Sequence, residues 1–344
     1  MGCCDEHTAI VPDTDVSRRG LLKGASVIAS IVPGLRPAAA QGKRLKLAFC
    51  SQLLCVIPYE VARAGGYFQR HGLDVELVYT RGGSAAMQAL VGGAVDYAAT
   101  ALDVAIQAYA KGAEIRRFAT TGRLPLFALA TAPKTAAQIQ SVKDLEGRTV
   151  GVSALGNADH ALLLFLLKQA NADARKVQFA TLGVNLLEAL RQAQVDAGLV
   201  QEPALTLLQR SGARVLVNAM DSADAHKYLG GPYEFMGVAV RAKEVETRRP
   251  EMVALARSLG DALGGLRTMP QTEIVSALPR ELTTGMDTAL IAELMGRYRE
   301  SLYPDTVTID LASANRVAES LKVGGLLAPN ADVSGLQDTS IAGG

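Results

Sequence analysis

Residues 83–113 read GSAAMQALVGGAVDYAATALDVAIQAYAKGA, and 100 positions later residues 183–213 read GVNLLEALRQAQVDAGLVQEPALTLLQRSGA. The two stretches share a first glycine and then Ala-Leu, Val-Asp and Gly-Ala pairs at the same offset. Each stretch predicts a helix, a short strand and a second helix, in that order. We therefore predict two lobes of similar α/β topology, with a chance match between generic α/β sequences as the alternative.

Strand and helix patterns continue on both sides of these stretches. Apolar and polar residues alternate in the predicted strands, and apolar residues recur at helical spacing between them. Strands that alternate with helices indicate a mostly parallel sheet in each lobe. The predicted strands span 44–49, 73–79, 95–99, 148–152, 177–180 and 197–200, with helices over 57–68, 159–170, 185–192 and 203–210 among those between them.

Two more apolar runs predict the connections between the lobes. Residues 126–130 predict a strand that crosses to the second lobe, and residues 235–240 predict the return crossing. The predicted fold class is therefore α/β, with two similar α/β lobes joined by two crossing strands and a ligand cleft between the lobes. Beyond Pro250 the pattern is mostly helical, with helices predicted over 252–266, 288–298 and 311–321.

These patterns assign the mature chain to two lobes and a tail. Residues 41–128 and 236–330 are assigned to lobe 1, and residues 129–235 to lobe 2. Residues 331–344 are rich in Asp, Ser and Gly and predict a loose tail.

The first forty residues predict an export signal. Ser17-Arg18-Arg19-Gly20-Leu21-Leu22-Lys23 resembles the twin-arginine motif, and a weakly apolar stretch runs on to Val32. Pro37-Ala38-Ala39-Ala40 then offers a small-residue cleavage site, so we expect cleavage near Ala40 and a periplasmic location. An amphipathic helix behind a chance arginine pair is the alternative.

Composition and charge argue against several classes of protein. The 344 residues include 35 basic and 34 acidic side chains, a formal net charge of +1, and no long basic run. Nucleic-acid binding is therefore not expected. The mature chain has no apolar stretch near the ~18 residues of a membrane-spanning helix.

The four cysteines do not have the spacing of a metal site. Cys3 and Cys4 precede the predicted cleavage site, so only Cys50 and Cys55 remain after export. Without paired CxxC spacing, neither zinc nor any other metal or cofactor is expected. Export places Cys50 and Cys55 in an oxidising compartment. The two residues either form a disulfide there or remain as two buried or loop thiols, and both alternatives are kept.

The predicted topology indicates where a ligand would bind. In open parallel sheets, ligands lie beyond the carboxyl ends of the strands, so two facing lobes form a cleft there. Gly82-Gly83-Ser84 and Gly156-Asn157-Ala158 open helices, whose free N–H groups favour anions, although helix capping is the commoner use of such residues. The candidate ligand-binding residues are Ser51, Gln52, Gly83, Ser84, Thr100, Ala101, Asp103, Phe127, Gly156, Asn157, Ala158, His160, Glu202 and Tyr233.

The chain resembles a known family in several motifs. Residues 60–77, EVARAGGYFQRHGLDVEL, resemble the opening of the nitrate/sulfonate/taurine-type solute-binding proteins, a group that includes binders of thiamine-pyrimidine precursors. Ser141 to Val152 is similar to the family's entry into the second lobe, and Gln192 to Pro203 to a later segment. The resemblance covers roughly residues 43–245. It implies a type II periplasmic binding fold, a monomeric receptor and an ABC permease partner.

Departures from the family pattern leave the ligand open. The family often has an aromatic residue just before Glu202-Pro203, where this chain has Gln201, and the chain contains no Trp. A flat ring would have to stack on Tyr or Phe, with Tyr59, Phe127, Tyr233 and Phe235 as candidates.

Charges near the predicted cleft favour two ligand classes. Arg81 and Arg123 suit a carboxylate or sulfonate, whereas Asp103, Asp159 and Glu202 suit an amine, a hydroxyl or a ring nitrogen. A small organic acid or sulfonate and a nitrogen heterocycle are therefore both expected ligand classes.

The predicted function is that of a periplasmic solute-binding receptor that hands a small molecule to an ABC importer by hinge closure, and not that of an enzyme. No GxSxG, HExxH or P-loop motif is present. Two alternatives remain. One is an enzyme like the superfamily's thiamine-pyrimidine synthase, whose cysteine-rich iron-binding cluster this chain does not match. The other is a ligand-sensing module for a membrane receptor.

Overall fold

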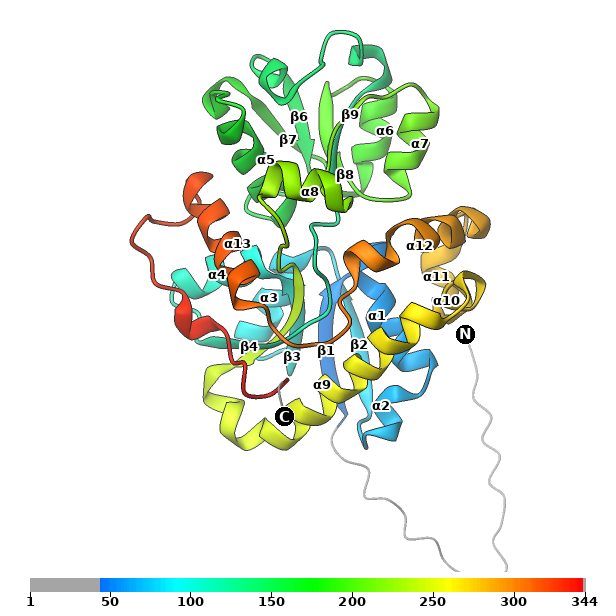
Figure 1. Ribbon diagram of the computed structural model, residues 1–344, viewed down its shortest axis with the longest axis vertical. Helices are drawn as coiled ribbons and strands as arrows, with labels where there is room; N and C mark the ends of the chain where they lie inside the picture. The colour runs from blue at the N-terminus through cyan, green and yellow to red at the C-terminus, as the bar shows by residue number, and fades with distance from the viewer. Residues whose placement is uncertain (1–43, 343–344) are drawn as a thin grey trace, which may run out of the picture. The chain divides into compact units, whose positions relative to one another are not determined.

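Two five-stranded sheets form the framework of the computed structural model, which describes residues 44–342. The predicted twin-arginine signal and its cleavage site lie outside the described residues. The strand order in the first sheet is β2-β1-β3-β10-β4 (Figure 1). These strands are β1 (Leu45–Cys50), β2 (Val75–Thr80), β3 (Tyr97–Ala101), β4 (Ile115–Thr120) and β10 (Met236–Arg241).

The second sheet repeats this order. Its strands run β7-β6-β8-β5-β9, so that β6, β7, β8 and β9 correspond to β1, β2, β3 and β4, while β5 takes the place of β10. In each sheet one strand, β10 or β5, is antiparallel to its neighbours. The strands are β5 (Ala128–Thr131), β6 (Thr149–Val152), β7 (Gln178–Thr181), β8 (Ala197–Val200) and β9 (Val215–Asn218).

The two copies of the Val-Asp pair have the same structural role. Asp96 precedes β3 and accepts a 2.9 Å hydrogen bond from the Lys46 backbone N–H at the start of β1. Asp196 precedes β8 and accepts a 2.9 Å hydrogen bond from the Thr149 backbone N–H at the start of β6. Gly112 and Gly212 have φ of 92° and 93°, so each repeat ends on the same left-handed turn. The offset of 100 therefore reflects equivalent elements.

Helices complete each α/β unit. The helices that alternate with the strands of the first sheet are α1 (Leu53–Ala64), α2 (Tyr67–Arg70), α3 (Gly83–Val91) and α4 (Leu102–Ala110). Those that alternate with the strands of the second sheet are α5 (Ala158–Gln169), α6 (Leu186–Arg191), α7 (Ala204–Arg210) and α8 (Ser222–Leu229). The strands β3 and β8 are buried along their whole length, as expected for parallel strands covered on both faces.

The C-terminal part of the chain is helical, as predicted. It contains α9 (Val245–Thr268), α10 (Gln271–Ala277), α11 (Arg280–Thr283), α12 (Thr288–Leu302) and α13 (Leu311–Val323). Helix α9 packs on α1 and α2, and α13 packs on both α4 and α5. The helix α13 thus touches elements that belong to each of the two sheets.

Two features of the strands differ from the prediction. The apolar runs predicted to cross between lobes form β5 and β10 inside the sheets, and the connecting segments are residues 121–127 and 230–235. Strands β4 and β9 were not among the predicted strands. In β4 the pair Arg116-Arg117 interrupts the apolar pattern, yet Arg117 is completely buried.

The predicted loose tail is packed against the first sheet as far as residue 342. Leu336 and Ile341 are buried, and Gln337 forms a parallel bridge with Arg117 of β4. The backbone N–H of Asp338 also donates a 2.8 Å hydrogen bond to the Arg117 carbonyl. These contacts were hidden because single apolar residues, spaced among polar ones, anchor the segment. Within residues 44–342, no helix is long and apolar enough to span a membrane.

Candidate functional site

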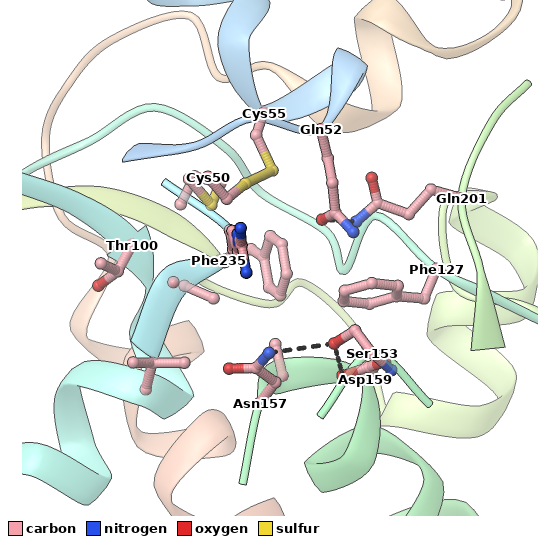
Figure 2. Close-up of a pocket in the computed structure, with 17 residues that line it drawn as sticks. Cys50, Gln52, Cys55, Thr100, Phe127, Ser153, Asn157, Asp159, Gln201 and Phe235 are labelled. Atoms are coloured by element: carbon pink, nitrogen blue, oxygen red, sulfur yellow. Dashed lines mark hydrogen bonds between the residues drawn. A yellow bond between two sulfur atoms is a disulfide. The ribbon is translucent and has the colours of Figure 1, made fainter. Parts of the chain in front are cut away.

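A pocket lies at the carboxyl ends of β1, β3, β6 and β8, the edge where ligands bind in parallel sheets. Its free volume is only about 30 Å³, so the two sheets' loops nearly fill it. Residues of both sheets and of both connecting segments form the wall (Figure 2). The wall comprises Cys50, Gln52, Cys55, Arg81, Gly82, Gly83, Thr100, Ala101, Val104, Phe127, Ser153, Asn157, Ala158, Asp159, Gln201, Phe235 and Met236.

Half of the predicted ligand-binding residues lie in this wall. They are Gln52, Gly83, Thr100, Ala101, Phe127, Asn157 and Ala158. Seven others do not line it: Ser51, Ser84, Asp103, Gly156, His160, Glu202 and Tyr233. Ser84 and Gly156 form hydrogen bonds between the loops next to the wall, whereas side chains such as Glu202 and Tyr233 bond to residues away from the pocket.

Four helices begin at the pocket without a side-chain cap. The N-cap residues of α1, α3, α4 and α5 are Gln52, Gly82, Ala101 and Asn157, and none of these side chains bonds to its helix N-terminus. By contrast, Asp221, Asp287 and Asp310 cap α8, α12 and α13 through their carboxylates. The starts of α1 and α3 direct N–H donors and a partial positive charge at the pocket, which favours an anion. In α4, by contrast, the Leu102 N–H donates to the Phe235 carbonyl at 2.8 Å and the Val104 N–H to Asp103 at 2.9 Å.

Arg81 adds a positive charge to the pocket wall. It follows β2, and no hydrogen bond or ion pair joins its guanidinium to any other residue within 44–342. Most other arginines of the described chain are engaged; Arg175 binds Asp173, for example, and Arg241 binds Glu244. A free guanidinium beside uncapped helix ends can take both oxygens of a carboxylate or sulfonate.

One side of the pocket is apolar. Phe127 and Phe235 come from the two connecting segments and meet edge to face, with ring centroids 6.0 Å apart. Met236 and Val104 extend this surface. Cys50 and Cys55, whose state the sequence left open, are joined by a disulfide that also lines the pocket (Figure 2). The wall therefore suits a ligand with both a charged group and an apolar body.

Hydrogen bonds join the two sheets' loops around the pocket. Ser84 Oγ donates to Asn157 Oδ1 at 2.5 Å, and Gln107 Nε2 donates to the Gly156 carbonyl at 3.1 Å. The amides of Gln52 and Gln201 face each other (Figure 2), and Gln201 Nε2 donates to Gln52 Oε1 at 2.6 Å. Ser84 and Gly156 thus belong to the contact between loops. These bonds hold the loops of the two sheets together around the pocket.

Two buried polar atoms in the wall have no partner among the described residues. They are Thr100 Oγ1 and Gln201 Oε1. A buried polar atom without a hydrogen bond costs free energy, so each atom is a candidate for a bond to a ligand or a water. Gln201 occupies the position that is often aromatic in the resembling family, and its amide offers hydrogen bonds where a ring would offer stacking.

Two buried carboxyl groups lie at or behind the wall. Asp159 accepts hydrogen bonds from the Ser153 backbone N–H and, at 2.8 Å, from Ser153 Oγ. Asp103 lies in the first turn of α4, between Leu102 and Val104, and burial raises its pKa to about 7. Burial also raises the pKa of Asp159. The pKa of each carboxyl group rises because burial removes water from the charged form and makes ionisation less favourable.

Three predicted residues have partners away from the pocket. Glu202 is buried and accepts hydrogen bonds from the backbone N–H and the hydroxyl of Thr206, both at 3.0 Å. His160 accepts a bond from the Gly156 N–H and meets Phe179 edge to face. Tyr233 shares a 2.9 Å hydrogen bond with Ser320. Their loops were placed correctly, but their side chains point elsewhere.

Ser51 is exposed and turns its hydroxyl to the Thr80 carbonyl at 3.0 Å, outside the pocket. Arg81, Asp159 and Phe235, which the sequence suggests for charge or stacking, do line the pocket. Ser153 also lines it, in the loop that the topology predicts at the edge of the cleft after the strand over 148–152, whereas nothing in the sequence distinguishes Met236. Among the described residues, no three His, Cys, Asp or Glu side chains gather as a metal site would require.

Comparison with known proteins agrees with the geometry. A family model described as NMT1/THI5 like matches residues 55–247. Among proteins of curated function, none matches the sequence.

Solved structures resemble the whole described chain. A protein from Bordetella bronchiseptica RB50 is 25% identical, with a TM-score of 0.78 over 88% of this chain and 96% of that one. The alkanesulfonate-binding protein SsuA from Xanthomonas axonopodis pv. citri, bound to MOPS, is 19% identical, with a TM-score of 0.68 over 87% and 99%. The periplasmic aliphatic sulphonate binding protein SsuA from Escherichia coli is 19% identical, with a TM-score of 0.67 over 86% and 92%. The predicted two-lobed periplasmic binding fold is confirmed.

Proposed function

The chain belongs to the NMT1/THI5-like family, and from this premise we propose that it is a periplasmic solute-binding protein that delivers a small organic anion to an ABC importer. The fold, shared with two sulfonate-binding proteins, supports a binding role. The ligand class rests on this chain's own pocket.

A single observation carries the ligand class. Four helices begin at the pocket with no side-chain cap, and the Arg81 guanidinium beside them has no partner among residues 44–342. This arrangement supplies hydrogen-bond donors and positive charge at one point, which suits a sulfonate or carboxylate. The Phe127 and Phe235 rings offer a surface for the ligand's apolar body.

Hinge closure is the proposed means of delivery. The free volume of about 30 Å³ is too small for an organic anion, so the loops must separate for the ligand to enter. Two connecting segments, 121–127 and 230–235, join the sheets and are tied together by a hydrogen bond from the Phe235 N–H to the Gly122 carbonyl. Bonds such as Ser84 to Asn157 would form again on closure.

The proposal includes export and excludes catalysis. Export by the twin-arginine route, cleavage near Ala40 and action as a monomer remain parts of the proposal that rest on the sequence. The Ser153 hydroxyl in the pocket donates to Asp159, and none of the described lining residues is a histidine or a lysine that would activate it as a nucleophile. We therefore expect a bound ligand to be released unchanged.

A thermal-shift panel tests the function. The purified protein is heated with benzenesulfonate, propanesulfonate, benzoate, propionate and nitrate, and with uncharged or cationic analogues such as benzyl alcohol and benzylamine as matched controls. We expect a dose-dependent rise in melting temperature with one or more organic anions and none with the controls, because a ligand that binds only the folded state stabilises it by mass action.

The panel also separates the alternatives. Recovery of the ligand intact by mass spectrometry supports a receptor, whereas a converted product would establish an enzyme. A shift with benzylamine or with a pyrimidine but with no anion would contradict the organic-anion proposal. A nitrate shift alone would leave the receptor role and change the ligand class.

A further inference from the structure

Two acidic side chains from opposite sheets are buried together next to the pocket. Asp103 lies in the first turn of α4 and is 3% exposed, and Asp159 lies in the first turn of α5 and is 1% exposed. The two helices pack on each other, and Gln107 of α4 donates to the Gly156 carbonyl just before α5. Each closure of the loops therefore brings two carboxyl groups into one dehydrated region.

The hydrogen bonds of the two groups are unequal. Asp159 accepts from both the backbone N–H and the hydroxyl of Ser153, so its negative charge is compensated. Asp103 accepts hydrogen bonds only from backbone N–H groups of its own helical turn, that of Val104 at 2.9 Å and its own, and from no side chain of the described residues. A buried carboxylate needs several donors or a cation, and Asp103 has no donor beyond that turn and no cation in the described structure.

No cation faces Asp103 from the elements packed around it. The carboxylate of Asp159 in α5 repels that of Asp103, and the charge of Asp103 in turn raises the pKa of Tyr233 in the return segment. The buried face of α13 presents Ser313, Val317, Ser320 and other uncharged residues, and α3 contains no charged residue. His160 turns to Phe179, and Arg81 lies across the wall in the pocket itself.

We propose, building on the proposed function, that Asp103 is a specificity-determining residue that takes up a proton when the cleft closes, so that the organic anion and a proton bind together. A protonated Asp103 removes one of two negative charges beside an anionic ligand, and it removes the cost of burying an uncompensated carboxylate. The geometry thus makes the proton a second ligand of the closed form.

The direction of the linkage follows from the two states of Asp103. In the closed form burial raises its pKa to about 7, from the ordinary value of 3.8 expected when it faces water in the open form. Between these values the closed form holds more protons than the open form, so affinity rises as pH falls through 7 and levels off near 3.8. Above about pH 8 the affinity no longer changes, because Asp103 is ionised in both forms.

Isothermal titration calorimetry with benzenesulfonate tests the linkage. This probe keeps its charge from pH 5.5 to 8.5, so its own titration contributes nothing. We expect about 30-fold tighter binding at about pH 5.5 than at about pH 8.5. Measured in imidazole and Tris buffers, which carry no sulfonate, the binding heats should differ by the uptake of about half a proton at pH 7.

Asp103→Asn isolates the residue. The amide mimics the protonated acid in shape, so we expect the variant to bind at pH 8.5 with the affinity that the wild type shows at 5.5, without proton uptake. Asp74→Asn, at an exposed aspartate before β2, is the matched control and should keep the wild-type pH profile. Unchanged pH dependence and proton uptake in Asp103→Asn would overturn the proposal.

Carboxyl titration by NMR keeps the two proposals separate. In spectra of protein with ¹³C-labelled aspartate, the signal that disappears in Asp103→Asn should titrate near the ordinary value of 3.8 without ligand and near pH 7 with a saturating anion. If an anion binds and this titration does not move above about pH 5, the proposal about Asp103 fails while the proposed function stands. If benzenesulfonate fails to bind while other panel anions also fail, the proposed function fails, and the co-binding of proton and anion fails with it.

Discussion

Arg117 of β4 shows how a single charged side chain can be built into a core. Its guanidinium is completely buried and forms a 2.8 Å ion pair with Glu234 of the return segment. Glu234 also accepts a 2.9 Å hydrogen bond from the backbone N–H of Asp310, which caps α13. The guanidinium fits because Gly237 has no Cβ, which would overlap it. This pair fastens the return segment to the first sheet, close to Phe235 of the pocket.

Arg81 is the residue whose change should affect binding most selectively. Replacing it by Gln removes the positive charge beside four helix N-termini, so we expect about 10- to 100-fold weaker binding of the panel's best anion, the range for a lost hydrogen bond to a charged group. Because no described residue bonds to the Arg81 guanidinium, the midpoint of urea unfolding should not move. Calorimetric titration and urea denaturation measure the two quantities.

Arg175→Gln, at an exposed arginine paired with Asp173 in the second lobe, is the control for Arg81. It should leave the affinity unchanged. Equal affinities of Arg81→Gln and the wild type would show that Arg81 is not part of the anion site.

At the scale of helices, three capped N-termini contrast with the four N-termini that meet at the pocket. Helices α8, α12 and α13 begin with an Asp whose carboxylate accepts hydrogen bonds from the first turn. Helices α1, α3, α4 and α5 begin at the pocket without such a bond. Helices such as α6 and α9 also begin without a side-chain cap away from the pocket, so a missing cap alone does not mark the site. The feature particular to the pocket is that four such N-termini meet there.

Alanine substitutions at two N-caps should reveal the difference between a capped and an uncapped helix start. Asp287→Ala removes bonds to the Ala289 and Leu290 N–H groups, and we expect the free energy of unfolding to fall by about 1 kcal/mol. Gln52→Ala, at the uncapped start of α1, should change it by less than about 0.5 kcal/mol. Urea denaturation measures both. Equal losses would mean that capping does not distinguish the two helix starts.

At the scale of the whole molecule, the two sheets share one topology and depend on two short connections. The return segment starts with Gly230 and Gly231, whose φ angles are 80° and 125°. Residues that carry a side chain rarely adopt these backbone angles. The two glycines therefore allow the chain to turn between α8 and β10. Arg316 binds the Pro232 carbonyl, Tyr233 bonds to Ser320, and Glu234 anchors the end of the segment to the first sheet. The two glycines are therefore left as the part able to bend.

Gly231→Ala should therefore affect both stability and binding. A residue with a Cβ at this φ is strained, and we expect the free energy of unfolding to fall by about 1–3 kcal/mol. Because the strain belongs to the described closed geometry, anion affinity should fall as well. Gly264→Ala, at an exposed helical position in α9 with nothing near the new Cβ, should instead stabilise by about 0.5–1 kcal/mol. Unaltered affinity in Gly231→Ala would argue against bending at this glycine.

The predictions from sequence succeeded where the signal is local. The strand and helix periods place β1, β2, β3, β6, β7 and β8, and the offset of 100 identifies equivalent elements in both sheets. The carboxyl-end loops identified from topology do form the pocket wall. Strand β4 was missed because Arg117 looks like a surface residue until Glu234, 117 positions away, is placed beside it.

The amino-acid sequence by itself determined the α/β class, the two similar lobes, the family and the loops that meet at the cleft, because periodicity and turn glycines act over a few residues. Only the tertiary structure decided which side chains in those loops face the pocket. Glu202 turns to Thr206 and His160 to Phe179, whereas Arg81 is left without a protein partner among residues 44–342. These choices depend on the direction of each side chain and on partners from distant segments, which only the packed chain brings together.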